Sequence, residues 1–259
     1  MKIAILGAGA FGTALGQVLL ENGYEVQYYD PILKGTSLDK ALSGADMVLV
    51  AVPSFALPAI LPALPSSLPL IIATKGILNQ HILDGFEDVM VISGPGFADD
   101  LKAHKTTLLT ATDQRVVDLF TTDYLTFDMT DDVRGVLLSG ALKNVYALLA
   151  GLLDLRPGTT EHEEFLYNVA EEMRDILEAN GGRRETIDLA CGKGDLRLTC
   201  GMPSRNYEFG QLKRLNSEYL PEKTVEGLSI LRKIREGEIK VPESANYLKN
   251  FLERSAKWG

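Results

Sequence analysis

The chain has 259 residues, of which 46% are hydrophobic and 24% charged, and its formal net charge is −9. This composition excludes an intrinsically disordered chain, and the acidic balance excludes a general nucleic-acid binder, which needs a basic surface. Two cysteines are too few for a disulfide scaffold or a four-ligand zinc site, so we expect a reduced, cytoplasmic environment. The length corresponds to one or two domains.

The first half of the chain alternates predicted strands with predicted helices. Helical periodicity covers Ala10–Asn22, Leu38–Ser43 and Ala56–Leu61. Short buried strands separated by helices predict parallel βαβ units, and therefore an α/β Rossmann-type domain over residues 1–130. The predicted strands are Lys2–Leu6, Glu25–Tyr29, Met47–Val52, Leu70–Ala73, Val89–Ser93, Thr106–Thr110 and Leu125–Asp128.

From Val133 onward the pattern is helical and strand alternation is absent. This change predicts a second, all-α domain over residues 131–259. The apolar stretch Leu57–Ala73 contains four prolines, and the first residues run directly into a strand, so we expect neither a membrane span nor a signal peptide. The predicted helices are Val133–Leu155, Glu161–Asn180, Arg184–Cys191, Val225–Glu236 and Ala245–Ser255.

A glycine-rich loop, Gly7-Ala8-Gly9-Ala10-Phe11-Gly12, follows the first strand and opens the first helix. In this context the G-x-G-x-x-G pattern is typical of dinucleotide binding. Gly7 permits the tight turn, Gly9 leaves room for a pyrophosphate, and Gly12 lets the helix pack closely on the strand. The alternative is a tight βα turn that binds nothing.

Asp30 ends the second predicted strand, about twenty residues after this loop. A carboxylate at this position accepts hydrogen bonds from a ribose 2′-hydroxyl and repels a 2′-phosphate, and only Lys34 lies close by. The sequence therefore favours NAD over NADP as the cofactor. The alternative is a solvated turn aspartate before Pro31.

Further short motifs stand at intervals along the chain. They are Ala51-Val52-Pro53-Ser54, Thr74-Lys75-Gly76, Ser93-Gly94-Pro95-Gly96-Phe97-Ala98, Gly140-Ala141-Leu142-Lys143-Asn144, Gly194-Asp195-Leu196-Arg197-Leu198-Thr199-Cys200, Ser204-Arg205-Asn206 and Val225-Glu226-Gly227. Together with the glycine loop, and in this order, they resemble the NAD(P)-dependent glycerol-3-phosphate dehydrogenase family. The resemblance spans nearly the whole chain.

The resemblance implies hydride transfer between NAD(H) and sn-glycerol 3-phosphate or dihydroxyacetone phosphate. Lys143 is then the general acid/base at the C2 hydroxyl, and its apolar helix is expected to lower the lysine pKa toward neutrality. Asp195 would orient Lys143, and Lys75 at a strand end would polarise the substrate oxygen. The expected cofactor residues are Gly7, Gly9, Ala10, Phe11, Gly12, Asp30, Ala98 and Glu226. The expected substrate residues are Lys75, Gly94, Asn144, Thr199, Ser204, Arg205 and Asn206, with Arg205 as the phosphate ligand because a guanidinium matches phosphate oxygens.

Each of these residues has a structural alternative. Lys143 could cover apolar helix surface while its amine reaches water, and Asp195 could cap a helix. Arg205 could belong to a surface ion pair, and Lys75 could be a solvated loop lysine. The histidines His81, His104 and His162 lack metal-ligand spacing, so we assign them no functional role and expect no metal.

The chain also departs from the family pattern. It is roughly seventy residues shorter than usual members, with most of the loss between Asp30 and Ala45. Gly96 replaces the usual serine, and Tyr207-Glu208 stands where a second arginine is expected. Tyr167-Asn168-Val169 replaces a Thr-Arg-Gly. The rival hypotheses are a diverged dehydrogenase of another small hydroxy acid or phosphorylated polyol, and an NAD-binding sensor without turnover. The sequence also leaves a homodimer open.

Overall fold

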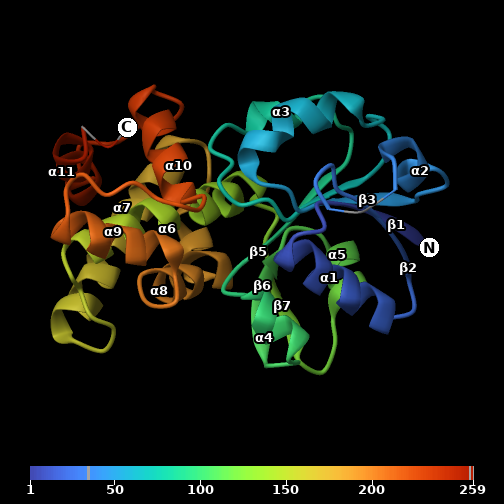
Figure 1. The fold of residues 1–259 in the computed structure, drawn as a ribbon, viewed down its shortest axis with the longest axis horizontal. Coiled ribbons are helices and arrows are strands. Elements are labelled where there is room, and N and C mark those ends of the chain that lie inside the picture. Colours follow the sequence, from blue (N-terminus) through green and yellow to red (C-terminus); the bar gives the residue numbers. More distant parts are fainter. Residues whose placement is uncertain (34–35, 257, 259) are drawn as a thin grey trace. The chain divides into compact units, whose positions relative to one another are not determined.

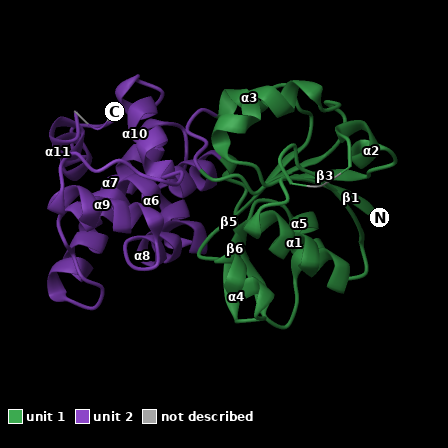
Figure 2. Cartoon of the chain, viewed as in Figure 1, with its two compact units in different colours: residues 1–75, 80–133 green, residues 76–79, 134–259 purple. Residues whose placement is uncertain are grey.

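The computed structural model describes residues 1–33, 36–256 and 258, so Lys34 lies outside the described residues. The chain forms two compact units (Figure 2). Unit 1 contains residues 1–75 and 80–133, and unit 2 contains residues 76–79 and 134–259. The four-residue segment 76–79 thus leaves the first unit directly after Lys75 and packs with the second.

Unit 1 is built on a seven-stranded sheet in the order β2-β1-β3-β4-β5-β6-β7 (Figure 1). The sheet has α1 and α5 on one face and α3 on the other. Its strands are β1 (Lys2–Leu6), β2 (Glu25–Tyr29), β3 (Met47–Val50), β4 (Leu70–Ile72), β5 (Val89–Ser93), β6 (Thr107–Ala111) and β7 (Leu125–Met129). Its α-helices are α1 (Ala10–Glu21), α2 (Leu38–Leu42), α3 (Leu57–Ile60), α4 (Ala98–Lys102) and α5 (Gln114–Phe120). Short 3₁₀ turns cover Ser54–Ala56, Leu61–Ala63 and Gln80–Leu83.

All seven predicted strands are present, with ends within two residues of the predicted ends. The expected parallel pairing fails at one place, because β5 and β6 pair antiparallel, with Ile92 opposite Ala111. β6 and β7 are parallel to each other, so they run opposite to the first five strands. The core between the sheet and α1, α4 and α5 consists of aliphatic and aromatic side chains from these elements.

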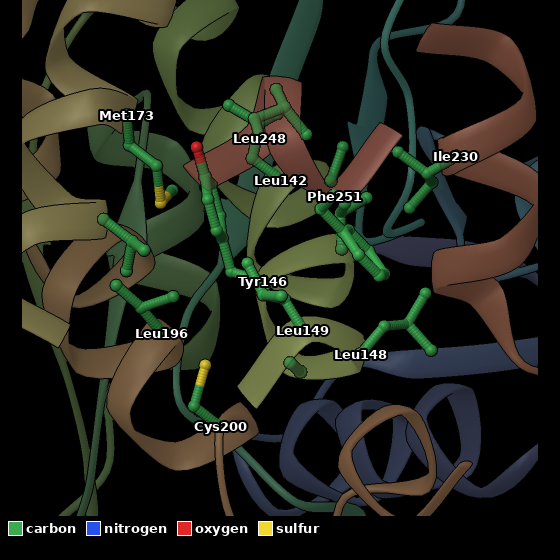
Figure 3. Close-up of a cluster of buried hydrophobic side chains, with 14 of the residues drawn as sticks. Leu142, Tyr146, Leu148, Leu149, Met173, Leu196, Cys200, Ile230, Leu248 and Phe251 are labelled. Atoms are coloured by element: carbon green, nitrogen blue, oxygen red, sulfur yellow. The ribbon is translucent and has the colours of Figure 1, made fainter. Parts of the chain in front are cut away.

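Unit 2 is helical and is organised around α6 (Val133–Leu152), in which seventeen of twenty residues are buried. Figure 3 shows side chains of this helix, among them Leu142, Tyr146 and Leu149, surrounded by apolar side chains of the same unit. α6 has the length and hydropathy of a membrane span, but 94% of its apolar window is buried inside the protein, as in the core helix of a globular domain.

The other helices of unit 2 surround α6. They are α7 (Thr160–Ala179), α8 (Asp195–Thr199), α9 (Arg205–Leu215), α10 (Glu226–Arg235) and α11 (Asn246–Arg254). The predicted helix Arg184–Cys191 is wrong: this segment forms a 3₁₀ turn over Arg184–Asp188 and the start of a π turn over Ala190–Gly194. The fold class, a Rossmann-type α/β domain followed by an all-α domain, is confirmed.

Close helix packing in unit 2 depends on glycine. A Cβ atom at Gly151 of α6 would lie 2.0 Å from the carbonyl oxygen of Tyr207, and one at Gly210 of α9 would lie 2.2 Å from that of Leu148. The backbones of α6 and α9 are therefore in direct contact. This contact fixes α9, which begins with Arg205, against the helix that carries Lys143.

Candidate active site

The glycine loop of unit 1 has the geometry that a pyrophosphate needs. Gly7 has a φ of +103°, and a Cβ there would lie 2.7 Å from the carbonyl oxygen of Ala51. A Cβ at Gly12 would lie 2.0 Å from the Gly7 carbonyl oxygen, so both positions require glycine. A Cβ at Gly9, in contrast, would meet no atom within 4 Å. Gly9 thus leaves open space at the entrance of α1.

The N-terminus of α1 has no side-chain cap. Gly9 is the N-cap residue and offers no side chain, and no acidic residue lies in the first turn, which contains Ala10 and Phe11. The first N–H groups of a helix have no partners within the helix, and with the helix dipole they attract anions. The loop and helix end therefore fit the phosphates of a dinucleotide.

Asp30 follows β2 and touches the glycine loop. Its carboxylate accepts hydrogen bonds from the backbone N–H groups of Ala8, Ile32 and Leu33, each at 2.9 Å. Burial raises the pKa of Asp30, but these three hydrogen bonds together bring it below the ordinary value. Asp30 is therefore a fixed anion beside the loop, and it also anchors its own turn. The structure shows the turn role of this aspartate, and its contact with a ribose stays a prediction.

Lys75 lies just after β4 and is half-buried. Its Nζ donates to the carbonyl oxygen of Gly94 at 3.4 Å and lies 5.3 Å from the ring centre of Phe11. The structure thus brings Lys75 together with the glycine loop and the end of β5, at the carboxyl ends of three parallel strands. Ala98 begins α4, which packs against α1. A fully solvated loop lysine is excluded.

In unit 2, Lys143 is 2% exposed and forms an ion pair with Asp195, which is 1% exposed. The side chain of Lys143 therefore does not reach water. The hydroxyl of Thr199, one turn along α8, donates to the other oxygen of Asp195 at 3.4 Å. Gly194 is the N-cap residue of α8 and Asp195 is its first residue, without a capping hydrogen bond, so the interpretation of Asp195 as a cap is wrong.

The segment before α8 forms a π turn over Ala190–Gly194, and such turns occur frequently at functional sites. A Cβ at Gly192 would lie 2.2 Å from the carbonyl oxygen of Ile187, so only glycine fits. At the other end of α8, burial raises the pKa of the Cys200 thiol; Asp195 adds to this effect and Lys143 opposes it. Cys200 therefore remains a neutral thiol.

The two asparagines expected to bind substrate bind each other. The Asn206 Nδ2 group donates to Asn144 Oδ1 at 2.9 Å, and Asn206 Oδ1 accepts from the backbone N–H of Gly227 at 2.9 Å. Asn144 also donates to the carbonyl oxygen of Gly140. These amides join α6 to the starts of α9 and α10, and so hold Glu226, the first residue of α10, in place.

The start of α9 is capped by Ser204, whose hydroxyl accepts from the backbone N–H of Tyr207. Arg205 is exposed, and its Nη1 donates to the carbonyl oxygen of Thr224 at 3.3 Å. Within the described part of the chain Arg205 forms no ion pair, which is contrary to the surface-pair alternative. Its guanidinium therefore keeps donors for an anion. Tyr207, in the place of the family's second arginine, is 2% exposed and donates to the Leu155 carbonyl oxygen.

The predicted site residues thus form two groups. Gly7, Gly9, Ala10, Phe11, Gly12, Asp30, Lys75, Gly94 and Ala98 lie in unit 1, and Asn144, Lys143, Asp195, Thr199, Ser204, Arg205, Asn206 and Glu226 lie in unit 2. His162, to which the sequence assigns no role, contacts the carbonyl oxygen of Cys200, the C-cap residue of α8. Among the described residues, no group of three or more histidine, cysteine or acidic side chains is placed to hold a metal ion.

Family models match both parts of the chain. The NAD-dependent glycerol-3-phosphate dehydrogenase C-terminus matches residues 132–250. The N-terminus of the same family matches residues 2–34 and 30–116. The break in the second match falls where the sequence places the start of the shortening.

Relatives agree with these matches. The glycerol-3-phosphate dehydrogenase [NAD(P)+] of Citrifermentans bemidjiense is 33% identical over 305 aligned positions, which cover 97% of this chain and 88% of the relative. That of Acidithiobacillus ferrooxidans is 34% identical over 257 positions, which cover 81% of this chain and 75% of the relative. The first alignment is longer than the chain, so this relative contains segments that the chain lacks.

Solved structures share the fold. The glycerol-3-phosphate dehydrogenase of Coxiella burnetii superposes with a TM-score of 0.79 at 25% identity and covers 98% of this chain and 95% of its own. The yeast enzyme of Saccharomyces cerevisiae gives a TM-score of 0.78 at 20% identity, covering 97% and 92%, and supports the fold. From the loop geometry, the buried lysine–aspartate pair and these matches, we conclude that the chain belongs to the NAD-dependent glycerol-3-phosphate dehydrogenase family of oxidoreductases.

Proposed function

We propose that the chain interconverts sn-glycerol 3-phosphate and dihydroxyacetone phosphate with NAD(H). Residues 1–130 would bind the cofactor, and residues 131–259 would bind the substrate. The observation that carries this proposal is the ion pair of Lys143 and Asp195, which is buried in unit 2 within motifs that match the family. A cofactor-binding sensor would not need a lysine held in this way.

Lys143 is the proposed general acid/base. In the oxidation direction its neutral amine takes the proton from the C2 hydroxyl while C2 loses a hydride and the C2–O bond becomes a carbonyl. When bound, the nicotinamide accepts that hydride. In the reduction direction Lys143 returns the proton to the forming alkoxide. Asp195 orients the amine and stabilises its protonated form, and Thr199 fixes the carboxylate.

The cofactor site is proposed in unit 1. The N–H groups at the start of α1 would hold the pyrophosphate, and Asp30 would hold the adenosine ribose, which favours NAD. Asp30 already accepts three backbone hydrogen bonds, so it has acceptor capacity left for about one hydroxyl. Ala98 and Glu226 would contribute further cofactor contacts, and Lys75 and Gly94 would face the substrate oxygen.

Arg205 is the proposed ligand of the substrate phosphate. It is exposed, and within the described part of the chain its guanidinium donates only to a backbone carbonyl, that of Thr224. Ser204, Asn144 and Asn206 are weaker candidates for binding the phosphate than Arg205. Their side chains already form hydrogen bonds that hold α6, α9 and α10 together. A single guanidinium in a bidentate arrangement discriminates strongly in favour of a phosphorylated substrate.

The test is an NADH-absorbance assay with dihydroxyacetone phosphate, run beside a panel of unphosphorylated ketones. The proposal expects turnover with the phosphorylated ketone and little with the others. Preferred turnover of an unphosphorylated ketone would support the diverged-dehydrogenase alternative. NADH binding without turnover of any ketone would support the sensor.

A further inference from the structure

His162 is buried in unit 2 and contacts the end of the helix that carries Asp195. It lies in the first turn of α7 and is 1% exposed. Its Nε2 lies 2.9 Å from the carbonyl oxygen of Cys200, the residue that ends α8. Because a carbonyl can only accept, the ring must carry its proton on Nε2 and donate. Its Nδ1 forms no hydrogen bond with a described residue, and Glu163 Oε1 lies 3.8 Å from it.

α8 needs support from outside because it is only five residues long. A helix of this length forms few hydrogen bonds between its own backbone groups, and its last carbonyl oxygens have no N–H partners within the helix. The π turn before Asp195 is irregular, so it does not extend α8. Figure 3 shows Leu196 and Cys200 of this segment among the apolar core side chains, where water does not replace a missing donor.

We propose that His162 is a positioning residue: through the Cys200 carbonyl it holds α8 so that Asp195 meets Lys143. This inference rests on the proposed function, because it presupposes that the Lys143–Asp195 pair serves the reaction. The thiol of Cys200 interacts electrostatically with both members of that pair, so the anchored end of α8 lies close to them.

A second link joins the same two helices at the surface and provides a matched control. Arg197 of α8 donates two hydrogen bonds to the carboxylate of Glu163, the residue after His162, at 2.6 and 2.5 Å. Both side chains are about half exposed, at 60% and 45%. Solvent-exposed ion pairs contribute little to stability, so this link should matter much less than the buried hydrogen bond.

The experiment compares His162→Gln, His162→Asn and His162→Leu with Arg197→Gln, which breaks the surface pair and keeps the Glu163 carboxylate that lies 3.8 Å from His162 Nδ1. The glutamine amide can reach the place of Nε2 and donate, whereas the asparagine amide is too short and leucine has no donor. We expect His162→Leu and His162→Asn to lose roughly 10- to 100-fold in kcat, because small displacements of reacting groups have effects of this size. The KM values for NADH and for dihydroxyacetone phosphate should change less than threefold. His162→Gln should recover most of kcat, and Arg197→Gln should stay within about twofold of wild type.

The pH profile separates positioning from a merely structural role. If α8 shifts, the ammonium form of Lys143 loses its carboxylate partner, so the rise of the oxidation rate with pH should move to lower pH in His162→Asn. A variant that only unfolds in part would lose amplitude without this shift. Equal losses in the glutamine and asparagine variants, or an unshifted profile, would overturn the inference. If Lys143→Ala keeps its turnover, Lys143 is not the base and this inference loses its premise. If the wild-type chain does not turn over dihydroxyacetone phosphate, the proposed function fails instead, whatever the His162 variants show.

Discussion

Removing Lys143 should cost stability as well as activity, because it leaves the Asp195 carboxylate buried without its lysine. Removing one partner of a buried ion pair typically costs roughly 3–5 kcal/mol of stability. For a chain of this length we expect the Tm of Lys143→Ala to fall by roughly 10 °C.

The double variant Lys143→Ala/Asp195→Asn separates stability from catalysis. The amide carries no charge, so the double variant should regain most of the lost stability in urea unfolding. Its turnover in the NADH assay should remain absent, because the general base is still missing. If the single variant is as stable as wild type at pH 7, the buried-charge reasoning is refuted. If the double variant turns over, Lys143 is not the base, and Lys75 becomes the next candidate.

The features predictable from the sequence are the local ones. The glycine loop was recognisable because a steric requirement at Gly7 and Gly12 acts over a few residues, and the apolar runs of the strands have the same origin. The direction of β6 was not predictable, because an apolar segment such as Thr107–Ala111 has the same sequence pattern in a parallel and in an antiparallel strand. Its direction is decided by the partner strands and not by its own residues.

The candidate site shows the same limit. Lys143 is recognisable in the sequence because it is a lysine within an apolar helix. The hydrogen bond between the Asn144 and Asn206 amides is not, because these residues are 62 positions apart. His162 stands at the start of a glutamate-rich helix, a pattern that predicts exposure to solvent. Its hydrogen-bond partner is a carbonyl oxygen 38 positions away in the sequence. The packing of α7 against α8 buries this histidine and supplies the carbonyl to which it donates, and neither can be seen in the sequence around it.

The remaining predictions concern the cofactor, the phosphate and helix packing. NADH should be preferred over NADPH by roughly 1–3 kcal/mol in catalytic efficiency, because a 2′-phosphate would face the Asp30 carboxylate; equal use of NADPH would contradict this role. Arg205→Ala should raise the KM for dihydroxyacetone phosphate at least tenfold and leave NADH binding, measured by fluorescence titration, unchanged; the opposite pattern would move Arg205 to the cofactor site. Gly210→Ala should destabilise unit 2 by about 3 kcal/mol, because its Cβ would lie 2.2 Å from the Leu148 carbonyl oxygen and rigid helix backbone must shift. Gly85→Ala is the matched control, since a Cβ there meets no atom within 4 Å; if thermal unfolding shows equal losses in both variants, the close contact of α6 and α9 does not limit stability.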